Sequence, residues 1–499
     1  MLTLTQPGRD RIIAATCHGP NGGFLRRSSK TSERTMPPFH AQPTVPTAPA
    51  LPAQGQRIAV VGTGISGLSC AWLLSQGSQG HEVTVFESES RLGGHSNTVD
   101  APVREGTVPV DTGFIVYNEP AYPNLTALFR HLSVPTAASD MSFAVSLDAG
   151  RLEYAGTDLR GLFAQKRNLA SPRFWSMLRE LLRFYREAPR DARHAGDQAL
   201  DDYLDARGYG RAFRDDHLYP MAAAIWSTPA ARVGRYPVAA FVRFCENHGL
   251  LQISDRPVWR TVAGGSREYV QRLSRPFAGR VHLDKPVLEL HREADGVRLR
   301  TTDGWWPQRF DQVVLATHAD RSLALLPDAS SDERALLGAF PYSRNLAVLH
   351  RDPALMPARR AVWSSWNYLG TRGSGAAPTV TYWMNRLQPH LPQGPQAEPI
   401  FLTLNPVTGP RPEHLIRTEV YDHPLFDAAA MAAQRHLWNL QGQRRTWFCG
   451  AYFGSGFHED GLQAGLAVAE ALGGVRRPWH VPQESGRIHL PQSVQAVAP

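Results

Sequence analysis

A glycine-rich turn within residues 57–87 constrains the fold of this chain more than any other feature. An apolar strand runs directly into Gly62, Gly64 and Gly67, which have the Gly-x-Gly-x-x-Gly spacing, and a helical pattern follows. In this arrangement the first glycine allows the tight bend, the second lets the backbone approach a pyrophosphate, and the third lets the helix pack closely on the strand. A second strand then ends at Glu87, where an acid accepts hydrogen bonds from a ribose. We therefore expect a βαβ unit that binds a dinucleotide.

The first turn of that helix supplies the groups that hold the phosphates. The N–H groups of Ile65 and Ser66 have no partner within the helix, and they stand at the positive end of the helix dipole. Anions bind at such helix starts. Ser88, directly after the acidic residue, is included among the expected cofactor contacts.

Length and composition are those of an ordinary globular protein. The 499 residues exceed the size at which one core usually stops growing, so two domains are expected. The four cysteines are far apart and form no Cys-x-x-Cys pair, which suits a reducing compartment and predicts no metal site. No apolar run reaches ~18 residues, so we expect no transmembrane segment. The expected location is the cytoplasm, either free or peripheral to the inner face of the membrane.

The net charge of +8 comes from arginine, because only three of the 53 basic residues are lysines. Such a balance favours anionic substrates or membrane surfaces, and it also arises from genome composition alone. The arginines are scattered and accompany no nucleic-acid recognition motif. Nucleic acid is therefore not an expected partner.

One amphipathic helix is predicted at residues 171–187. Ser171 is placed as its N-cap and Pro172 at its first position. Apolar side chains recur at helical spacing, and arginines occupy other positions. The apolar residues are Phe174, Trp175, Leu178, Leu181, Leu182 and Tyr185. The arginines are Arg173, Arg179, Arg183 and Arg186. Both a membrane-surface helix and a core helix with a solvated basic face have this pattern, and we favour the core helix.

Further elements follow the glycine turn in a fixed order. They are Arg91 with Gly93-Gly94, Asp111-Thr-Gly113, Gly264-Gly-Ser266, the strand that reaches Val287, Val313-Val-Leu-Ala-Thr317 and a block from Trp447 to Gly465. Together with the turn, these elements resemble the amine oxidase and phytoene desaturase superfamily of flavoproteins. The resemblance covers most of residues 55–475. It implies an α/β fold, in which a Rossmann-type FAD-binding domain of the two-dinucleotide-binding kind carries an inserted α+β substrate domain.

The resemblance also implies the cofactor and its contacts. Cys449 does not match the cysteine that carries covalent flavin in monoamine oxidases, so non-covalent FAD is expected. The C-terminal block returns to the cofactor, where a helix N-terminus faces the flavin. The expected cofactor contacts are Gly62, Gly64, Ile65, Ser66, Gly67, Glu87, Ser88, Arg91, Gly93, Gly94, His95, Val287, Ala316, Gly450, His458, Glu459 and Leu462.

Composition shifts and these elements together suggest how the domains are divided along the chain. We expect a disordered N-terminal extension over 1–54, which is equally a candidate transit peptide or the product of a start upstream of Met36. The FAD-binding domain is expected in three parts, over 55–118, 261–338 and 433–475. The substrate domain is expected over 119–260, where it is mainly helical, and over 339–432. A flexible tail is expected over 476–499.

Three segments carry a narrower resemblance. Residues 93–100, 110–118 and 456–462 resemble a group of bacterial flavoproteins that are similar to the N-terminal region of plant cyclopropane fatty acid synthases. Such proteins tend to be associated with enzymes that modify lipid acyl chains. This implies a small-molecule or lipid substrate, a lipid-modifying enzyme as a partner, and peripheral membrane contact.

Departures from the amine oxidases bear on the substrate. Amine oxidases commonly carry a lysine that holds a water at the flavin, and Asn345 falls at that position here. Phe457 falls at one of the two aromatic positions that sandwich a substrate amine. We expect the substrate pocket to include Tyr117, Asn345, Tyr382 and Phe457.

The chemistry expected is hydride removal by the flavin, which needs orientation, a dry pocket and a place for the proton. His458 and Glu459 are the candidates to handle that proton, although each has an alternative role as a structural or cofactor contact. The favoured hypothesis is oxidation of a hydrophobic substrate such as a lipid acyl chain. The alternatives are amine oxidation and a flavin-bound accessory protein of a lipid-modifying enzyme.

Overall fold

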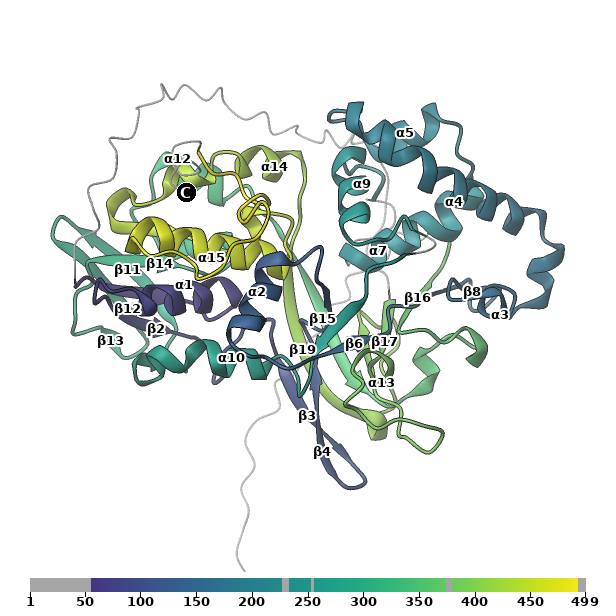
Figure 1. Ribbon diagram of the computed structural model, residues 1–499, viewed down its shortest axis with the longest axis horizontal. Helices are drawn as coiled ribbons and strands as arrows, with labels where there is room; N and C mark the ends of the chain where they lie inside the picture. The colour runs from purple at the N-terminus through teal and green to yellow at the C-terminus, as the bar shows by residue number, and fades with distance from the viewer. Residues whose placement is uncertain (1–54, 227–232, 253–254, 374–378, 492–499) are drawn as a thin grey trace, which may run out of the picture. The chain divides into compact units, whose positions relative to one another are not determined.

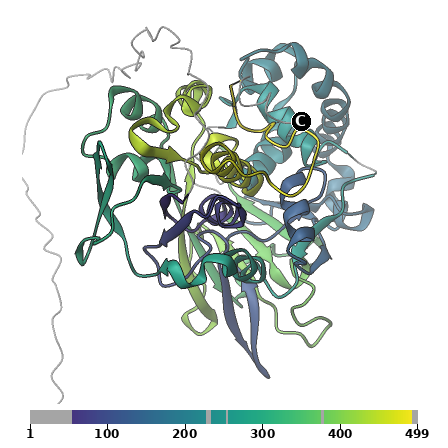
Figure 2. The same cartoon turned by 60° about the vertical axis from the view of Figure 1, so that its left-hand side comes forward.

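The computed structural model describes residues 55–226, 233–252, 255–373 and 379–491 (Figures 1 and 2). The expected extension over 1–54 lies outside the described residues. Within the described part, two large hydrophobic cores form, one around the glycine-turn unit and one around a second sheet and a group of helices.

Five parallel strands form the sheet that carries the glycine turn. In spatial order they are β10 (Val281–His282), β2 (Glu82–Phe86), β1 (Arg57–Val61), β14 (Gln312–Leu315) and β20 (Thr446–Phe448). Every neighbouring pair is parallel. Parallel sheets are buried on both faces, which is why β1 is apolar after Arg57. Three separate stretches of the chain thus meet in one sheet.

Two long helices pack together beside this sheet. They are α1 (Ile65–Gln76), which follows the glycine turn, and α15 (His458–Gly473), near the C-terminus (Figure 1). Their backbones approach closely at Gly465, where a Cβ atom would lie 2.2 Å from the carbonyl oxygen of Ser66. Helix α15 begins at His458, so its first turn reaches the carboxyl end of the sheet.

Smaller elements complete this half. A three-stranded antiparallel sheet consists of β11 (Val287–Glu293), β12 (Gly296–Thr301) and β13 (Gly304–Trp305). The helices are α2 (Pro123–His131), α10 (Arg267–Ser274), α11 (Ala319–Ala324), α12 (Ser331–Leu337) and α14 (Ala428–Gln434).

A seven-stranded sheet forms the base of the second core. Its order is β19 (Leu415–Pro424), β15 (Tyr342–His350), β18 (Phe401–Leu404), β17 (Thr379–Trp383), β16 (Trp366–Gly370), β7 (Phe143–Leu147) and β8 (Leu152–Ala155). All neighbours are antiparallel except β16 and β7. Strands from residues 143–155 and 342–424 therefore share one sheet, as an inserted domain made from two chain segments requires.

Short strands connect the two halves. A hairpin pairs β3 (Thr98–Val103) with β4 (Gly106–Asp111), and a small sheet has the order β5 (Tyr117–Asn118), β9 (Trp259–Val262) and β6 (Thr136–Ser139). They place the segment between β4 and β5 against the cavity described below.

Helices cover the seven-stranded sheet. They include α3 (Leu159–Leu162), α4 (Pro172–Asp191), α5 (Leu200–Ala206), α7 (Tyr219–Trp226) and α9 (Val238–Asn247). The predicted cap of α4 is confirmed, since the Ser171 hydroxyl accepts a hydrogen bond from the Phe174 N–H at 3.3 Å. No described helix is both long enough and apolar enough to cross a bilayer.

The prediction of a flexible tail from residue 476 is wrong for residues 476–491. The side chain of Arg477 is fully buried and donates to Glu470 at 2.8 Å, to the Asn124 side chain at 3.0 Å and to the Glu484 carbonyl at 2.8 Å. The proline and polar residues of 476–491 suggested a segment without a core of its own. The buried Arg477 nevertheless holds the segment in place through an ion pair with Glu470 of α15 and a hydrogen bond to Asn124 of α2.

Candidate functional site

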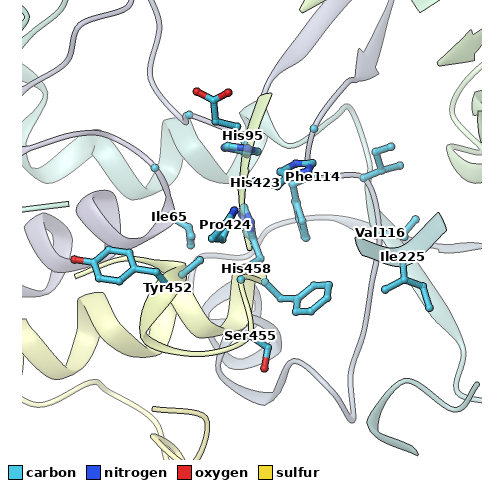
Figure 3. Close-up of a pocket in the computed structure, with 18 of the residues that line it drawn as sticks. Ile65, His95, Phe114, Val116, Ile225, His423, Pro424, Tyr452, Ser455 and His458 are labelled. Carbon is cyan, nitrogen blue, oxygen red and sulfur yellow. The ribbon is translucent and has the colours of Figure 1, made fainter. Parts of the chain in front are cut away.

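A cavity of about 1350 Å³ begins at the carboxyl ends of the parallel strands and continues beside the seven-stranded sheet. Its first part is lined by the glycine turn, and its second part by apolar side chains from the other half. Figure 3 shows Ile65 at one side of this space and Val116 with Ile225 at another. Ligands of open α/β sheets bind at the carboxyl ends of the strands, so this position fits a cofactor site.

The glycine turn leaves room for a ligand in one place and excludes a side chain in another. A Cβ atom on Gly64 would meet no protein atom within 4 Å, and Gly64 lines the cavity. A Cβ atom on Gly67 would lie 2.0 Å from the carbonyl oxygen of Gly62. Gly64 also precedes α1 without a side-chain cap, so the N–H groups of Ile65 and Ser66 are available to an anion. The residues present fit the pyrophosphate of a dinucleotide.

Glu87 is held at the expected end of β2. Its carboxylate accepts hydrogen bonds from the Thr63 N–H at 3.0 Å, the Ser88 hydroxyl at 3.1 Å and the Glu89 N–H at 3.0 Å. Both Glu87 and Ser88 line the cavity. The Thr63 hydroxyl donates to the carboxylate of Glu87 as well, so donors from the protein keep the carboxylate in one orientation at the edge of the cavity.

The second glycine element lies against the first. A Cβ atom on Gly94 would lie 3.1 Å from the Cα atom of Gly64, and Gly94 lines the cavity with His95. Gly93 and Arg91 do not line it. The Arg91 guanidinium instead donates to the Gly94 carbonyl at 2.8 Å and pairs with Glu89 at 2.9 Å. In this structure the Arg91 side chain therefore holds the glycine turn in place, and its direct contact with the cofactor stays a prediction.

Other predicted contacts reach the cavity from distant parts of the chain. Val287, at the start of β11, lines the end near Glu87, and Ala316, directly after β14, lies across from the glycine turn. Gly450, which follows β20, lines the cavity as well. The structure thus brings together, around one cavity, predicted cofactor contacts that are separated by up to several hundred residues.

Four histidines gather where the two parts of the cavity meet. They are His95, His318, His423 and His458, and all four line it. The ring of His95 lies 5.5 Å from that of His423 and 6.1 Å from that of His318. Burial, with a further contribution from His318, lowers the pKa of His423 to about 4. Burial and the neighbouring histidines also hold the pKa of His95 well below its usual range. These rings are therefore neutral at physiological pH, and they add hydrogen-bonding groups without positive charge.

His458 begins α15 and is fixed on two sides. Its Nε2 atom lies 2.8 Å from the Tyr269 hydroxyl and 3.1 Å from the Ser96 hydroxyl. Its ring stacks on Phe114, with 3.8 Å between the ring centroids (Figure 3). Burial lowers the pKa of His458 to about 3. The ring is thus a neutral, immobilised part of the cavity wall, and a role in proton transfer stays a prediction.

Glu459 does not face the cavity. Its buried carboxylate accepts hydrogen bonds from the backbone N–H groups of Asn124 at 3.1 Å and Leu125 at 3.0 Å, and from the Gln463 amide at 3.0 Å. The carboxylate therefore accepts hydrogen bonds from N–H groups in the first turn of α2 that have no partner within that helix. The predicted part of Glu459 in proton transfer is corrected, because the carboxylate has no open side toward the cavity. Leu462 is likewise buried in the core and does not line the cavity.

Two of the four predicted substrate residues line the cavity. Tyr382 and Phe457 do so, and Phe457 stacks on Phe244 of α9 with 4.9 Å between centroids. Tyr117 is a correction, because it is buried in the first core against Tyr122 and does not reach the cavity. A short β5 turns its side chain inward, which no local pattern in the sequence indicates.

Asn345 also stands one layer behind the cavity wall. Its amide nitrogen donates to the Ser343 carbonyl at 3.0 Å and lies 3.1 Å from Nδ1 of His423, while its oxygen accepts from Asn405 at 2.8 Å. A carbonyl oxygen can only accept, so the Asn345 atom that bonds the Ser343 carbonyl must be the amide nitrogen. The same nitrogen then donates to His423, and Nδ1 of His423 is the acceptor. The proton of the neutral imidazole ring therefore lies on Nε2.

Sequence reasoning missed His423, His318 and Phe114. His423 is placed by the pairing of β15 with β19, in which Ser343 lies opposite His423. His318 directly follows the Val-Val-Leu-Ala-Thr element, so the motif that located Ala316 could also have located His318. His423 has no such local signal, because its neighbours in space come from a strand about 80 residues away.

Comparison with known families and proteins gives one family match over most of the chain. The model described as flavin containing amine oxidoreductase matches residues 65–472. A protein of Mycobacterium tuberculosis (strain CDC 1551 / Oshkosh), named as the flavin-containing monoamine oxidase AofH, is 28% identical over 331 residues. The match covers 64% of this chain and 69% of that protein.

Solved structures share the fold at low identity. Cyclohexylamine oxidase from Brevibacterium oxydans IH-35A has a TM-score of 0.58 at 18% identity, over 84% of this chain and 99% of that chain. The CLA-producing fatty acid isomerase from P. acnes has a TM-score of 0.56 at 16% identity, over 82% and 97% of the two chains. At such identities the likeness establishes the mixed α/β fold.

Proposed function

This chain belongs to the flavin containing amine oxidoreductase family and is an FAD-dependent oxidoreductase, and from that premise we propose that it oxidises a hydrophobic substrate such as a lipid acyl chain. The observation that carries the proposal is the lining of the cavity beyond the histidines. That part is lined by Val116, Met141, Phe143, Met221, Ile225, Phe244, Trp366 and Tyr382. An apolar lining of this kind binds apolar chains by removing them from water.

Bound FAD supplies the two-electron acceptor for such an oxidation. The residues that would hold it are those of the glycine turn, Glu87, Gly94, Val287 and Gly450, and the buried Cys449 does not line the cavity, which supports non-covalent binding. The protein contributes a dry pocket and neutral rings at the meeting point of its two parts. The Nε2–H of His423 is available as a hydrogen-bond donor, and Asn345 keeps it in that tautomer.

Arg256 favours an anionic or neutral substrate over a cationic one. It lines the cavity, is exposed to solvent, and pairs with no carboxylate among the described residues. Asp140, which also lines the cavity, is occupied by Arg386 at 2.6 Å. We infer that the carboxylate or phosphate end of an amphipathic substrate lies toward Arg256, with its acyl chain among the apolar side chains.

Anaerobic reduction of the bound flavin tests this proposal. We expect bleaching by fatty acids or phospholipids, with a rate that depends on chain length. Ile225→Trp fills the apolar part and should abolish reduction by long chains while the flavin content stays unchanged. The matched control is Val407→Trp, at an 85% exposed position outside the cavity. Equal reduction of both variants by long chains would contradict the proposal.

Amine oxidation is the second candidate. The named activities of AofH and cyclohexylamine oxidase favour it, and so does Asp422, a lining carboxylate beside His423 that could meet an ammonium group. Bleaching by an amine panel that is lost in Asp422→Asn would establish it. Bleaching by neither class, with co-purification of a lipid-modifying enzyme, would instead support the accessory role.

A further inference from the structure

The outward side of α4 exposes apolar and basic side chains in alternation. Trp175 is 49% exposed and Leu182 is 52% exposed, and Arg179, Arg186 and Arg190 are exposed between and beyond them. These positions are three or four residues apart, so they form one stripe along the helix. Within the sequence pattern, Trp175 and Leu182 belong with the core positions, but the structure turns them to solvent while Phe174, Met177 and Phe184 are buried.

More exposed apolar side chains lie beside the start of this helix. Leu159 of α3 is 74% exposed and Leu169 is 53% exposed. The Trp175 indole donates to the Leu169 carbonyl at 2.9 Å, and the ring of Phe163, which directly follows α3, lies 5.6 Å from the Trp175 ring between centroids. Four of the eleven large apolar side chains that are exposed in the described chain therefore fall within residues 159–182. We call this surface the α4 face (right side of Figure 1).

A basic pocket of about 350 Å³ opens at the N-terminal end of α4. Its charged lining consists of Arg151, Arg167, Arg173 and Arg372 around the buried Asp216. Arg173 binds Asp216 through two hydrogen bonds of 2.7 and 3.0 Å, and Arg372 donates to the same carboxylate at 2.6 Å. The shared acid therefore holds two guanidinium groups in fixed positions at the pocket wall.

The charge of the pocket is not fully balanced. Asp216, Asp215 and Asp148 pair with Arg173 and Arg372, so three carboxylates face these two guanidinium groups. Arg151 and Arg167 are exposed and have no ion pair with any described residue. Exposed Lys166 and Arg160 add further positive charge to this surface, so its electrostatic partner is an anion.

We propose that the α4 face docks on an anionic phospholipid bilayer, and that the arginine pocket receives the phosphate of a lipid head group. Guanidinium groups match phosphate oxygens geometrically. Trp and Leu side chains at the level of the head groups contribute apolar contact, and clustered basic residues add attraction to anionic lipids. Free phosphate or nucleic acid would use the arginines but would leave the four apolar side chains without a role. The proposal does not depend on the substrate of the flavin site.

Vesicle co-sedimentation of the flavin-loaded full chain tests this surface. We expect binding to vesicles of phosphatidylcholine with phosphatidylglycerol, weaker binding at high salt, and little binding to phosphatidylcholine alone. Arg151→Gln with Arg167→Gln should weaken vesicle affinity by roughly 30-fold, from two charges at about 1 kcal/mol each. Trp175→Ala with Leu182→Ala should also weaken it. Arg344→Gln and Val407→Ser, which change exposed residues elsewhere, should leave it unchanged.

Flavin content and thermal stability identify variants that fold, so that a loss of vesicle binding is read only in folded protein. The proposal is overturned if wild-type protein does not distinguish anionic from neutral vesicles, or if the control variants lose as much affinity as the α4-face variants. It is also overturned if inorganic phosphate or RNA binds the arginine pocket while vesicles do not. Vesicle binding that needs both the arginines and the apolar side chains supports it.

Discussion

Two glycines of the turn should respond in opposite ways to substitution. Gly64 has extended backbone angles (φ −62°, ψ 175°) that any residue adopts, and it is the uncapped N-cap of α1. Gly64→Asp supplies an N-cap carboxylate and restricts the unfolded chain, which together should stabilise the apoprotein by about 0.5–1 kcal/mol. The new side chain also projects into the cavity and places negative charge where a pyrophosphate binds. We expect a stable protein without flavin.

Gly67→Ala should have the reverse effect. Replacing a glycine inside a helix by alanine gains about 1 kcal/mol of helix propensity. The new methyl group would lie 2.0 Å from the Gly62 carbonyl oxygen, so backbone atoms must shift. Overpacking of this kind typically costs about 1–3 kcal/mol, and contact with backbone rather than with a flexible side chain favours the upper end of that range. The net expectation is a loss of up to about 2 kcal/mol in the apoprotein.

Thermal unfolding of the apoproteins, followed by titration with FAD, measures both effects. Without FAD, the order of stability should be Gly64→Asp, wild type, Gly67→Ala. With FAD at about 100 times its Kd, wild type gains about 2.7 kcal/mol and overtakes Gly64→Asp, which gains nothing. An apoprotein of Gly64→Asp that is less stable than wild type, or one that keeps full flavin absorbance, would refute the assignment of open space at Gly64.

Three further expectations follow from buried polar groups. Arg477→Met leaves the Glu470 carboxylate without its buried partner. Chemical denaturation should therefore show that the free energy of unfolding falls by about 3 kcal/mol. An unaltered denaturation midpoint would mean that residues 476–491 are not anchored to the rest of the protein. Burial lowers the pKa of His217 to about 4, so the unfolded state binds more protons between pH 4 and the usual value near 6.5. His217 should therefore contribute a loss of roughly 3 kcal/mol of stability as pH drops through that range, in addition to the losses from the other buried histidines. His217→Phe should remove this contribution from the pH profile of stability. Glu459→Gln places donors against the N–H groups of α2 and should destabilise the fold by about 1–3 kcal/mol. The folded variant should nevertheless keep the wild-type rate of flavin reduction. A slower rate at full flavin content would mean that Glu459 takes part in catalysis.

Local patterns predicted the cofactor end of the site well. The glycine turn, the helix after it and the acid at the end of β2 act within about 30 residues, and the observed contacts of Thr63, Gly64 and Glu87 follow that pattern. The capping of α4 by Ser171 was equally local. Such features depend on backbone geometry and on neighbours a few residues away, so they can be inferred without the rest of the fold.

The substrate end depends on contacts across the chain. Asn345 was located by comparison with the lysine position of the amine oxidases, but its side chain faces His423 rather than the cavity because β15 pairs with β19. Glu459 follows a glycine block that approaches the cofactor, yet its carboxylate is used by α2, more than 330 residues earlier. Neither orientation is encoded in nearby residues.

The sequence alone was enough to predict a Rossmann-type unit that binds a dinucleotide, because a phosphate-binding turn is built from one short segment whose glycines allow only a few backbone shapes. The resemblance carried by the further elements then implied that the dinucleotide is FAD. The folded structure was needed to show which side chains line the cavity, that Arg91 and Glu459 support its wall, and that Trp175 and Leu182 face outward. The physical reason is that a side chain's surroundings are set by strand register and helix packing, which join residues hundreds of positions apart.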